Sequence, residues 1–429
     1  LCQLAFECLI MLRIMESQVS IISYVGLTLS IYLTLFISLI WTLLVHFVRL
    51  WLELLSGVWI MRRVFPFLEI IIQRFRRVLG LERVLIERRD LTGKICIVTG
   101  GADGIGKRVS EYFVQCGATV IIADIQENKG RVSAYKINTN NADSAGFAKY
   151  MYIDLSDQEW IVDNRSPILS SDLADSSDYD RLDILVNNAG IGSGYGRRDS
   201  LPRKGSFNHI FQVNYVGTFI LTELLLTVLK STNDSRIVNT CSPIHRFFGS
   251  NLRKILEYSQ IPNCDYAYGA SKAAILLYTL KLRRDAMGLT FCQTLQTDTV
   301  GDGHENFPWS TCVNPGSVNT SIFPDTFPYN IVYYFKWLLL DTRTGSETTI
   351  FASTCPKEQA TLYMSPYWLP GNGSWFIDKF ADILSIYIGP HFTIPDLSDD
   401  AALSAEYLYE WTYNHWRTCS SKETSSAAN

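Results

Sequence analysis

The chain has 429 residues, enough to bury one large core or two ordinary domains. Its formal net charge of −4 at pH 7 gives no reason to expect a surface that binds nucleic acid. The 10 cysteines and 6 histidines show no spacing typical of a zinc site. We therefore expect reduced thiols and no metal centre.

Residues 1–90 are predicted to form a membrane anchor. No Asp, Glu, Lys or Arg occurs in 19–48, and a spanning helix needs about 20 apolar residues, so a span is expected here. A cleaved signal peptide would have a shorter apolar region, a basic start and a small-residue cleavage site. In 62–89, apolar residues recur three and four apart between arginines, which favours a helix lying among lipid headgroups. A second span or a hairpin is the alternative.

Charge around the span predicts the orientation of the chain. Arginine dominates the flank after the span, so the positive-inside rule places the rest of the chain in the cytoplasm. A different reading is a soluble enzyme whose first ninety residues are mistranslated. Met15 is a plausible start, so whether 1–14 belong to the protein stays open, as it does for the loop-like stretch 296–309.

The segment 91–418 is predicted to form the catalytic domain. It begins with an apolar strand at 94–99, a turn of glycines from Gly100 to Gly106, and a helical pattern from Lys107. Strand, glycine-rich turn and helix in this order are typical of dinucleotide binding, because backbone N–H groups and the helix N-terminus can approach the pyrophosphate.

The second strand is expected at 119–124 and ends in a carboxylate, Asp124, about 20 residues beyond the glycine turn. Asp124 can accept hydrogen bonds from the adenosine ribose hydroxyls and would repel a 2′-phosphate. No arginine immediately follows to receive such a phosphate. NAD is therefore favoured over NADP, without NADP being excluded.

At this point the sequence resembles the short-chain dehydrogenase/reductase family across residues 93 to about 365. The turn Thr99–Gly106 is similar to the TGxxxGxG turn of that family, and later motifs follow in the family order. They are Asp154-Leu155, Asn187-Asn188-Ala189-Gly190, Asn214, Ser242, Tyr268-x-x-x-Lys272, and Asn314-Pro315-Gly316 followed by Val318 and Thr320.

The resemblance implies an α/β fold with a Rossmann-like doubly wound parallel sheet, which would follow the helical membrane anchor predicted above from the apolar run. It implies the catalytic residues Asn214, Ser242, Tyr268 and Lys272. It also implies a set of residues that bind the cofactor: Gly100, Asp103, Gly104, Ile105, Gly106, Asp124, Asp154, Leu155, Asn187, Ala189, Gly190, Tyr268, Lys272, Pro315, Gly316, Val318 and Thr320.

The resemblance also assigns roles to the catalytic residues. A tyrosine with an ordinary pKa near ~10 is a poor base at neutral pH. The ammonium of Lys272, one helical turn away, is expected to lower the pKa of Tyr268 so that it can take the alcohol proton as hydride leaves. Ser242 would stabilise charge on the substrate oxygen. Asn214 would hold a water that links Lys272 to solvent.

Residues after Ser242 are similar to the retinol-dehydrogenase-like branch of the family. This branch implies a hydrophobic small-molecule substrate (a retinoid, steroid or polyisoprenoid alcohol), contact with membrane lipid, and the endoplasmic reticulum as location. A homodimer formed through long central helices is a further expectation. The competing hypothesis is a catalytically idle, nucleotide-binding scaffold at a membrane. The tail, 419–429, is predicted to be disordered.

Overall fold

A computed structural model describes residues 89–163, 181–192, 207–262, 264, 266–288, 307–322, 339–360, 362–364 and 399–426. The chain divides into two compact units, Leu1–Phe65 and Pro66–Asn429, and all described residues belong to the second. The predicted span at 19–48 and all but the last residue of the segment 62–89 lie outside the described residues, as do 296–306 of the uncertain loop.

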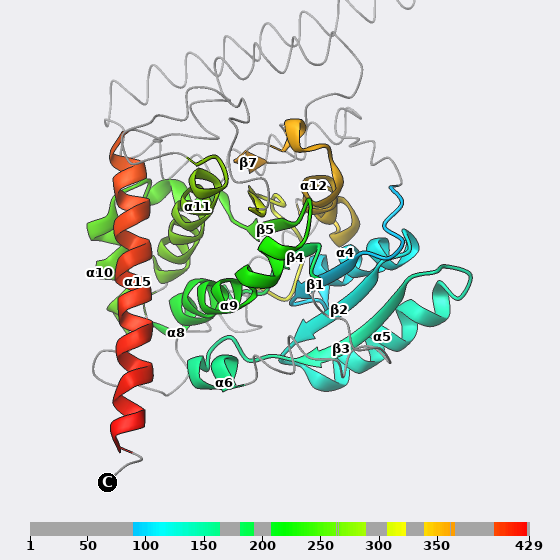
Figure 1. Ribbon diagram of the computed structural model, residues 1–429, viewed down its shortest axis with the longest axis horizontal. Helices are drawn as coiled ribbons and strands as arrows, with labels where there is room; N and C mark the ends of the chain where they lie inside the picture. Colours follow the sequence, from blue (N-terminus) through cyan, green and yellow to red (C-terminus); the bar gives the residue numbers. More distant parts are fainter. Residues whose placement is uncertain are drawn as a thin grey trace, which may run out of the picture. The chain divides into compact units, whose positions relative to one another are not determined.

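The described part of the chain contains a parallel sheet of seven strands in the order β3-β2-β1-β4-β5-β6-β7 (Figure 1). This order confirms the Rossmann-like doubly wound sheet that the sequence predicts. The strands are β1 Ile95–Thr99, β2 Thr119–Asp124, β3 Phe147–Tyr152, β4 Ile184–Asn187, β5 Arg236–Thr240, β6 Trp309–Val313 and β7 Tyr363–Met364.

Helices connect the strands and cover the sheet. The first begins at Gly104, three residues before the predicted start, because the Asp103 side chain accepts a hydrogen bond from the Gly104 N–H and caps it. The helical elements are α4 Gly104–Gln115, α5 Glu127–Asn140, α6 Gln158–Asp163, α8 His209–Phe211, η3 Gln212–Gly217, α9 Thr218–Ser231, η4 Pro243–Phe247, α10 Leu252–Gln260, α11 Tyr266–Ala286, α12 Thr342–Thr354, η6 Lys357–Gln359 and α15 Asp399–Ser426.

Both faces of the central strands are buried, which explains why β1, β2 and β4 read as nearly continuous apolar runs, whereas the edge strand β3 is partly exposed. Side chains alternate between the faces along each strand. Ile97 and Ile121 belong to a core cluster that includes residues of α9, α11 and α15. Val98 and Ile122 belong to a second cluster with residues of α4, α5 and α12.

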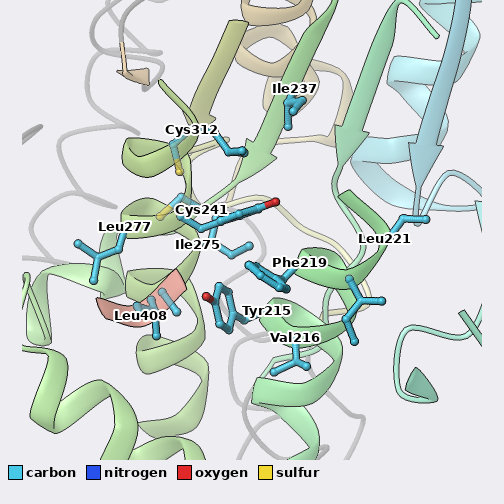
Figure 2. Packing of buried hydrophobic residues seen from close by; sticks show 14 of the residues in the cluster. Tyr215, Val216, Phe219, Leu221, Ile237, Cys241, Ile275, Leu277, Cys312 and Leu408 are labelled. Carbon is cyan, nitrogen blue, oxygen red and sulfur yellow. The ribbon is translucent and has the colours of Figure 1, made fainter. Parts of the chain in front are cut away.

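The first of these clusters is rich in aromatic rings (Figure 2). Tyr215 and Phe219 pack beside Tyr278 of α11, with ring centroids 6.4 and 5.0 Å from that of Tyr278. From α15, Tyr409 packs against Phe219 at 5.5 Å, and Leu408 is fully buried. The C-terminal helix thus packs on the two long central helices, the elements through which the sequence analysis expects a homodimer to form.

Helix α15 extends to Ser426, so its last eight residues lie within the segment predicted to be a disordered tail. The Ser-rich composition of that segment does not end the helix. The described stretch His209–Ser231 is long and apolar enough to cross a membrane, but 67% of its apolar window is buried inside the structure. Here it forms the central part of the aromatic core described above.

Candidate active site

The candidate site lies where the strand order reverses, between β1 and β4, which is where ligands bind in sheets of this type. Asn188, directly after β4, ties the two strand ends together. Its side-chain amide donates to the Thr99 carbonyl at 3.0 Å, and its backbone N–H donates to the Thr99 hydroxyl at 3.0 Å. The second hydrogen bond to that hydroxyl comes from the Ala189 N–H, also at 3.0 Å.

The glycine turn after β1 is held close to this junction. Gly100 has φ +65°, a conformation that favours glycine. A Cβ atom on Gly106 would lie 2.6 Å from the Asn188 amide nitrogen and closer still to the Gly100 carbonyl. Only glycine therefore fits at Gly106, and the turn presents backbone rather than side chains to the space in front of α4.

A cavity of about 600 Å³ opens in front of the turn, a volume within the range of small-molecule and cofactor sites. The structure brings most of the predicted site residues together around it. Its walls include Gly100, Asp103, Gly104, Ile105, Asp124, Asp154, Leu155, Ala189, Gly190, Ser242, Tyr268, Lys272, Pro315, Gly316, Val318 and Thr320. The glycine turn and the size of the cavity together fit an extended dinucleotide.

Asp124 lies at the end of β2, in the wall of this cavity, and its side chain is only 6% exposed. One carboxylate oxygen accepts from the Ala102 N–H at 3.1 Å and the other from the Gln126 N–H at 2.9 Å. These two hydrogen bonds fix the carboxylate between the glycine turn and the start of α5. The predicted contact between Asp124 and ribose hydroxyls is compatible with this placement.

Ser242 and Tyr268 meet on the opposite side of the cavity. Ser242 precedes the 3₁₀ helix η4 and Tyr268 lies in the first turn of α11. Burial raises the pKa of Tyr268 to about 12, while a hydrogen bond with Ser242 acts in the opposite direction. The sequence alone predicts a lowered pKa for Tyr268, whereas in this structure the cost of burying the phenolate outweighs the hydrogen bond that favours it.

Lys272 lies one helical turn after Tyr268 and is 4% exposed. Its ammonium donates to the Thr240 carbonyl at 2.9 Å and lies 5.7 Å from the centre of the Tyr268 ring. Burial lowers the pKa of Lys272, because a charged ammonium loses solvation there. A Cβ on Gly190 would be 3.5 Å from the Lys272 nitrogen, so glycine keeps the space beside the ammonium open.

Asn214 does not line the cavity, but its side chain holds a segment of backbone that does. It falls in η3, a π-helical stretch, a feature often found at functional sites. Its side-chain oxygen accepts from the Ile191 N–H at 2.8 Å, and its amide donates to the Ile191 carbonyl at 3.0 Å and to the Ser271 hydroxyl at 3.1 Å. Asn214 therefore holds the backbone beside Gly190, and the water that it is predicted to hold near Lys272 stays a prediction.

Two of the residues predicted to bind the cofactor, Gly106 and Asn187, also lie outside the cavity wall. Gly106 is covered by the turn itself, as described above. Asn187 points into the core, where its amide donates to the Asn239 side chain at 2.8 Å and to the Thr222 hydroxyl at 3.0 Å. Asn239 continues the chain of hydrogen bonds to Thr279 at 2.9 Å. This buried network supports the sheet beneath the site.

Sequence reasoning missed several residues of the cavity wall. Asn188 is not among the predicted site residues, although it lies inside one of the motifs that carry the resemblance. His209 and Val213 both line the cavity and are four residues apart, the spacing that places two side chains on one face of a helix. Burial lowers the pKa of His209, and Asp154 acts in the opposite direction.

Comparison with known proteins agrees with this geometry. A model of the short chain dehydrogenase family matches residues 94–289, from the first strand to the end of the helix that carries Tyr268 and Lys272. A short chain dehydrogenase/reductase named dpchH, from Colletotrichum higginsianum, is 28% identical over 284 residues, which cover 62% of this chain and 64% of the relative.

Two human proteins are also similar. The protein named Polyprenol dehydrogenase is 28% identical over 297 residues, covering 67% of this chain and 80% of the relative. The protein named Retinol dehydrogenase 11 is 33% identical over 198 residues, covering 46% of this chain and 58% of the relative. This chain thus aligns with less than two thirds of the length of Retinol dehydrogenase 11 and of the fungal relative.

Replacing Asn214 by alanine would remove all three hydrogen bonds that hold Ile191 and Ser271. Because two of the groups left behind belong to the backbone beside Gly190, we expect the free energy of unfolding to fall by about 1–3 kcal/mol. We also expect dinucleotide affinity to fall about tenfold, equivalent to about 1.4 kcal/mol. Denaturant titration and calorimetric binding measure the two effects.

Asn251→Ala is the matched control for Asn214→Ala. Asn251 accepts from the Lys254 N–H at 3.0 Å and caps α10, and it does not belong to the cavity wall. Its replacement should cost about 1 kcal/mol of stability and leave nucleotide affinity unchanged. Equal nucleotide affinity in the native protein and in Asn214→Ala would contradict the positioning role.

Proposed function

Since this chain belongs to the short-chain dehydrogenase/reductase family, we propose that it is an NAD(P)-dependent oxidoreductase that interconverts an alcohol and a carbonyl compound. The observation that carries the proposal is that the half-buried Ser242 and the buried Tyr268 and Lys272 lie together in the wall of the cavity that also contains the glycine turn. A bound nicotinamide dinucleotide supplies the acceptor or donor of hydride.

The chain supplies the proton chemistry. Tyr268 holds its proton at neutral pH, because burial raises its pKa to about 12. As an acid it can donate this proton to a carbonyl oxygen that becomes an alcohol. In the opposite direction it must first lose the proton, which positive charge nearby favours; the Lys272 ammonium, 5.7 Å from the ring centre, is one source. Ser242 donates a hydrogen bond to the same substrate oxygen.

We propose NAD as the physiological cofactor. The support is Asp124, a buried carboxylate fixed in the cavity wall by the backbone of the glycine turn. A carboxylate at this position can accept hydrogen bonds from ribose hydroxyls and repels a phosphate carried by the same ribose. Asp154 and Leu155 line the cavity beyond it and are proposed to contact the adenine.

The substrate is proposed to be a lipid-like alcohol or its carbonyl form. Tyr268 packs in a small apolar cluster with Ile191, Ile244 and Ile322, so the catalytic hydroxyl lies beside hydrocarbon surface. The names of the two human relatives point to polyisoprenoid and retinoid alcohols for those proteins. A substrate of this class would partition into lipid, which fits the predicted anchor in 1–90.

Replacing Tyr268 by phenylalanine should lower the rate of hydride transfer by about 10²–10⁴-fold, since the general acid–base group is lost while the ring and its packing remain. The measurement is single-turnover oxidation of a panel of lipid alcohols, and reduction of their aldehydes, by membranes that contain the full chain. Hydride transfer that continued undiminished in Tyr268→Phe would contradict the mechanism and favour an idle nucleotide-binding scaffold.

Tyr266→Phe is the matched control. Tyr266 lies two residues earlier in α11, is 55% exposed and does not belong to the cavity wall. The same chemical change at this position should leave hydride transfer within about twofold of the native rate, because a surface substitution removes no buried contact.

The membrane location is also a proposal: the anchor in 1–90 holds the chain at the endoplasmic reticulum with the catalytic domain in the cytoplasm. We expect the full chain to stay with the membrane pellet after extraction with alkaline carbonate. We also expect the catalytic domain to be digested by protease added outside intact microsomes, which exposes the cytoplasmic face. Release into the supernatant would contradict the anchor, and protection from protease would contradict the orientation.

A further inference from the structure

His245 is a buried side chain next to the active site, with no part in the proton chemistry proposed above. It lies in η4, three residues after Ser242, and is only 1% exposed. It does not belong to the cavity wall. Its Nε2 atom is buried and has no hydrogen-bond partner among the described residues. A polar atom left without a partner costs stability, so the presence of a histidine here calls for an explanation in the other contacts of the ring.

The other ring nitrogen holds the backbone of Ser242. Nδ1 lies 2.6 Å from the Ser242 carbonyl oxygen, and since a carbonyl can only accept a hydrogen bond, Nδ1 must carry a proton. The backbone N–H of His245 donates to the same oxygen at 3.1 Å. The next residue, Pro243, restricts Ser242 to an extended conformation, and Ser242 has φ −155° and ψ 151°. His245 thus supplies two donors to one carbonyl and fixes the peptide that carries the serine.

The helix η4 packs closely on the turn of α11 that carries Tyr268. A Cβ atom on Gly269, the residue after Tyr268, would lie 2.6 Å from the ring of Phe248 and 3.0 Å from the side chain of Ile244. Ile244 lies in η4, and Phe248 is the residue that ends it. Because glycine allows this close approach, the position of η4 determines where Ser242 meets Tyr268.

The thiol of Cys241 adds a contact between His245 and α11. Its sulfur lies 3.5 Å from Nδ1 of His245 and 3.3 Å from the Lys272 carbonyl oxygen. The thiol can therefore donate to that carbonyl, while the Nδ1 proton goes to Ser242 over the shorter distance of 2.6 Å. His245 thus contacts the backbone of Ser242 and, through one sulfur atom, the backbone of Lys272.

We propose, on the basis of the function assigned above, that His245 is a positioning residue, which holds Ser242 so that the serine hydroxyl meets Tyr268 and the substrate oxygen. The serine side chain is short, so the direction of its hydroxyl follows the direction of the peptide. Without the Nδ1 donor, the Ser242 carbonyl keeps only the backbone donor, and the hydroxyl is free to turn away from Tyr268. The histidine acts through the serine and is not itself a catalytic residue.

Two amide variants separate this role from packing. In His245→Asn the amide nitrogen is attached to Cγ, as Nδ1 is in histidine, so a donor to Ser242 is kept. In His245→Gln the amide nitrogen takes the place of Nε2 instead. We expect single-turnover oxidation of a lipid alcohol at saturating NAD to slow about ten- to a hundredfold in His245→Gln, because the serine loses its orientation, and to stay within about threefold of the native rate in His245→Asn.

The pH dependence of the same reaction gives a readout that a loss of packing would not change. Burial raises the pKa of Tyr268, and the hydrogen bond with Ser242 acts against burial. Without that hydrogen bond the pKa rises further, so in His245→Gln the increase of the oxidation rate with pH should move to higher pH. The neighbouring titratable groups, Lys272 and Cys241, are the same in all variants.

Calorimetric titration of the full chain in detergent with NAD reports whether each variant folds. The dissociation constant should stay within about twofold of the native value. If His245→Gln binds no NAD, His245→Phe takes its place, because phenylalanine lacks the donor and keeps a ring. Loss of NAD binding in both variants would show that the histidine supports the fold as a whole, and would overturn the inference.

His415→Gln is the matched control for His245→Gln. His415 lies in α15, with its ring centre 4.6 Å from that of Phe207, and does not belong to the cavity wall. The same chemical change at this position should leave both the rate of oxidation and its pH profile as they are in the native chain.

The change His245→Gln is also made in Ser242→Ala, where it should lower the remaining rate by less than about twofold, because the hydroxyl to be positioned is absent. Three results would overturn the inference: a native rate and pH profile in His245→Gln, an equal loss in His245→Asn, or an equal loss with and without the Ser242 hydroxyl. A native chain that transferred no hydride would instead overturn the proposed function, and the inference with it.

Discussion

The chemistry proposed for this chain depends on a phenol and an ammonium being buried together at the carboxyl edge of a parallel sheet. Tyr268 and Lys272 share one face of α11 and are 7% and 4% exposed. Burial raises the pKa of the phenol and lowers the pKa of the ammonium, so it favours the neutral form of each group. Proton transfer at this site therefore depends on the charges that surround the pair.

The sheet and its neighbouring helices hold this pair in place. Lys272 is anchored to the last residue of β5 through the Thr240 carbonyl. Beneath it, the buried amides of Asn187 and Asn239 connect adjacent strands to each other and to hydroxyls of α9 and α11. Unpaired amide N–H groups in such a place would be costly, so these hydrogen bonds favour one arrangement of strands and helices.

On the nucleotide side, backbone groups do most of the positioning. The Thr99 hydroxyl receives two N–H groups from the turn after β4, and Asp124 receives two from the turns around it. These contacts bring the ends of three strands to fixed distances from the glycine turn.

Much of this arrangement could be predicted from the sequence, because short apolar strands followed at once by glycine or carboxylate are local signals. The ends of β2 and the spacing of Tyr268 and Lys272 could be predicted from the neighbouring residues alone. The contacts of Asn214 and Asn187 could not be predicted in this way, because a family motif indicates where a residue lies but not where its side chain points. The pKa of Tyr268 could not be predicted either, since burial is a property of the packed core.

The length of α15 could not be predicted from the local sequence either. Its Ser-rich end suggests disorder, whereas the structure continues the helix to Ser426. Upstream, Leu408 and Thr412 of the same helix are buried against the central helices, and Tyr215 pairs with the Thr412 hydroxyl at 3.0 Å. Such contacts join residues nearly two hundred positions apart, and no local pattern reports them.

The most direct test of the account is the pH dependence of single-turnover alcohol oxidation at saturating NAD, compared between the native chain and Lys272→Met. We expect a rate that rises with pH as Tyr268 loses its proton. We also expect this rise to move to higher pH when the ammonium is removed, because the phenolate then loses a favourable charge. A rate independent of pH, or a profile that Lys272→Met leaves in place, would contradict the account.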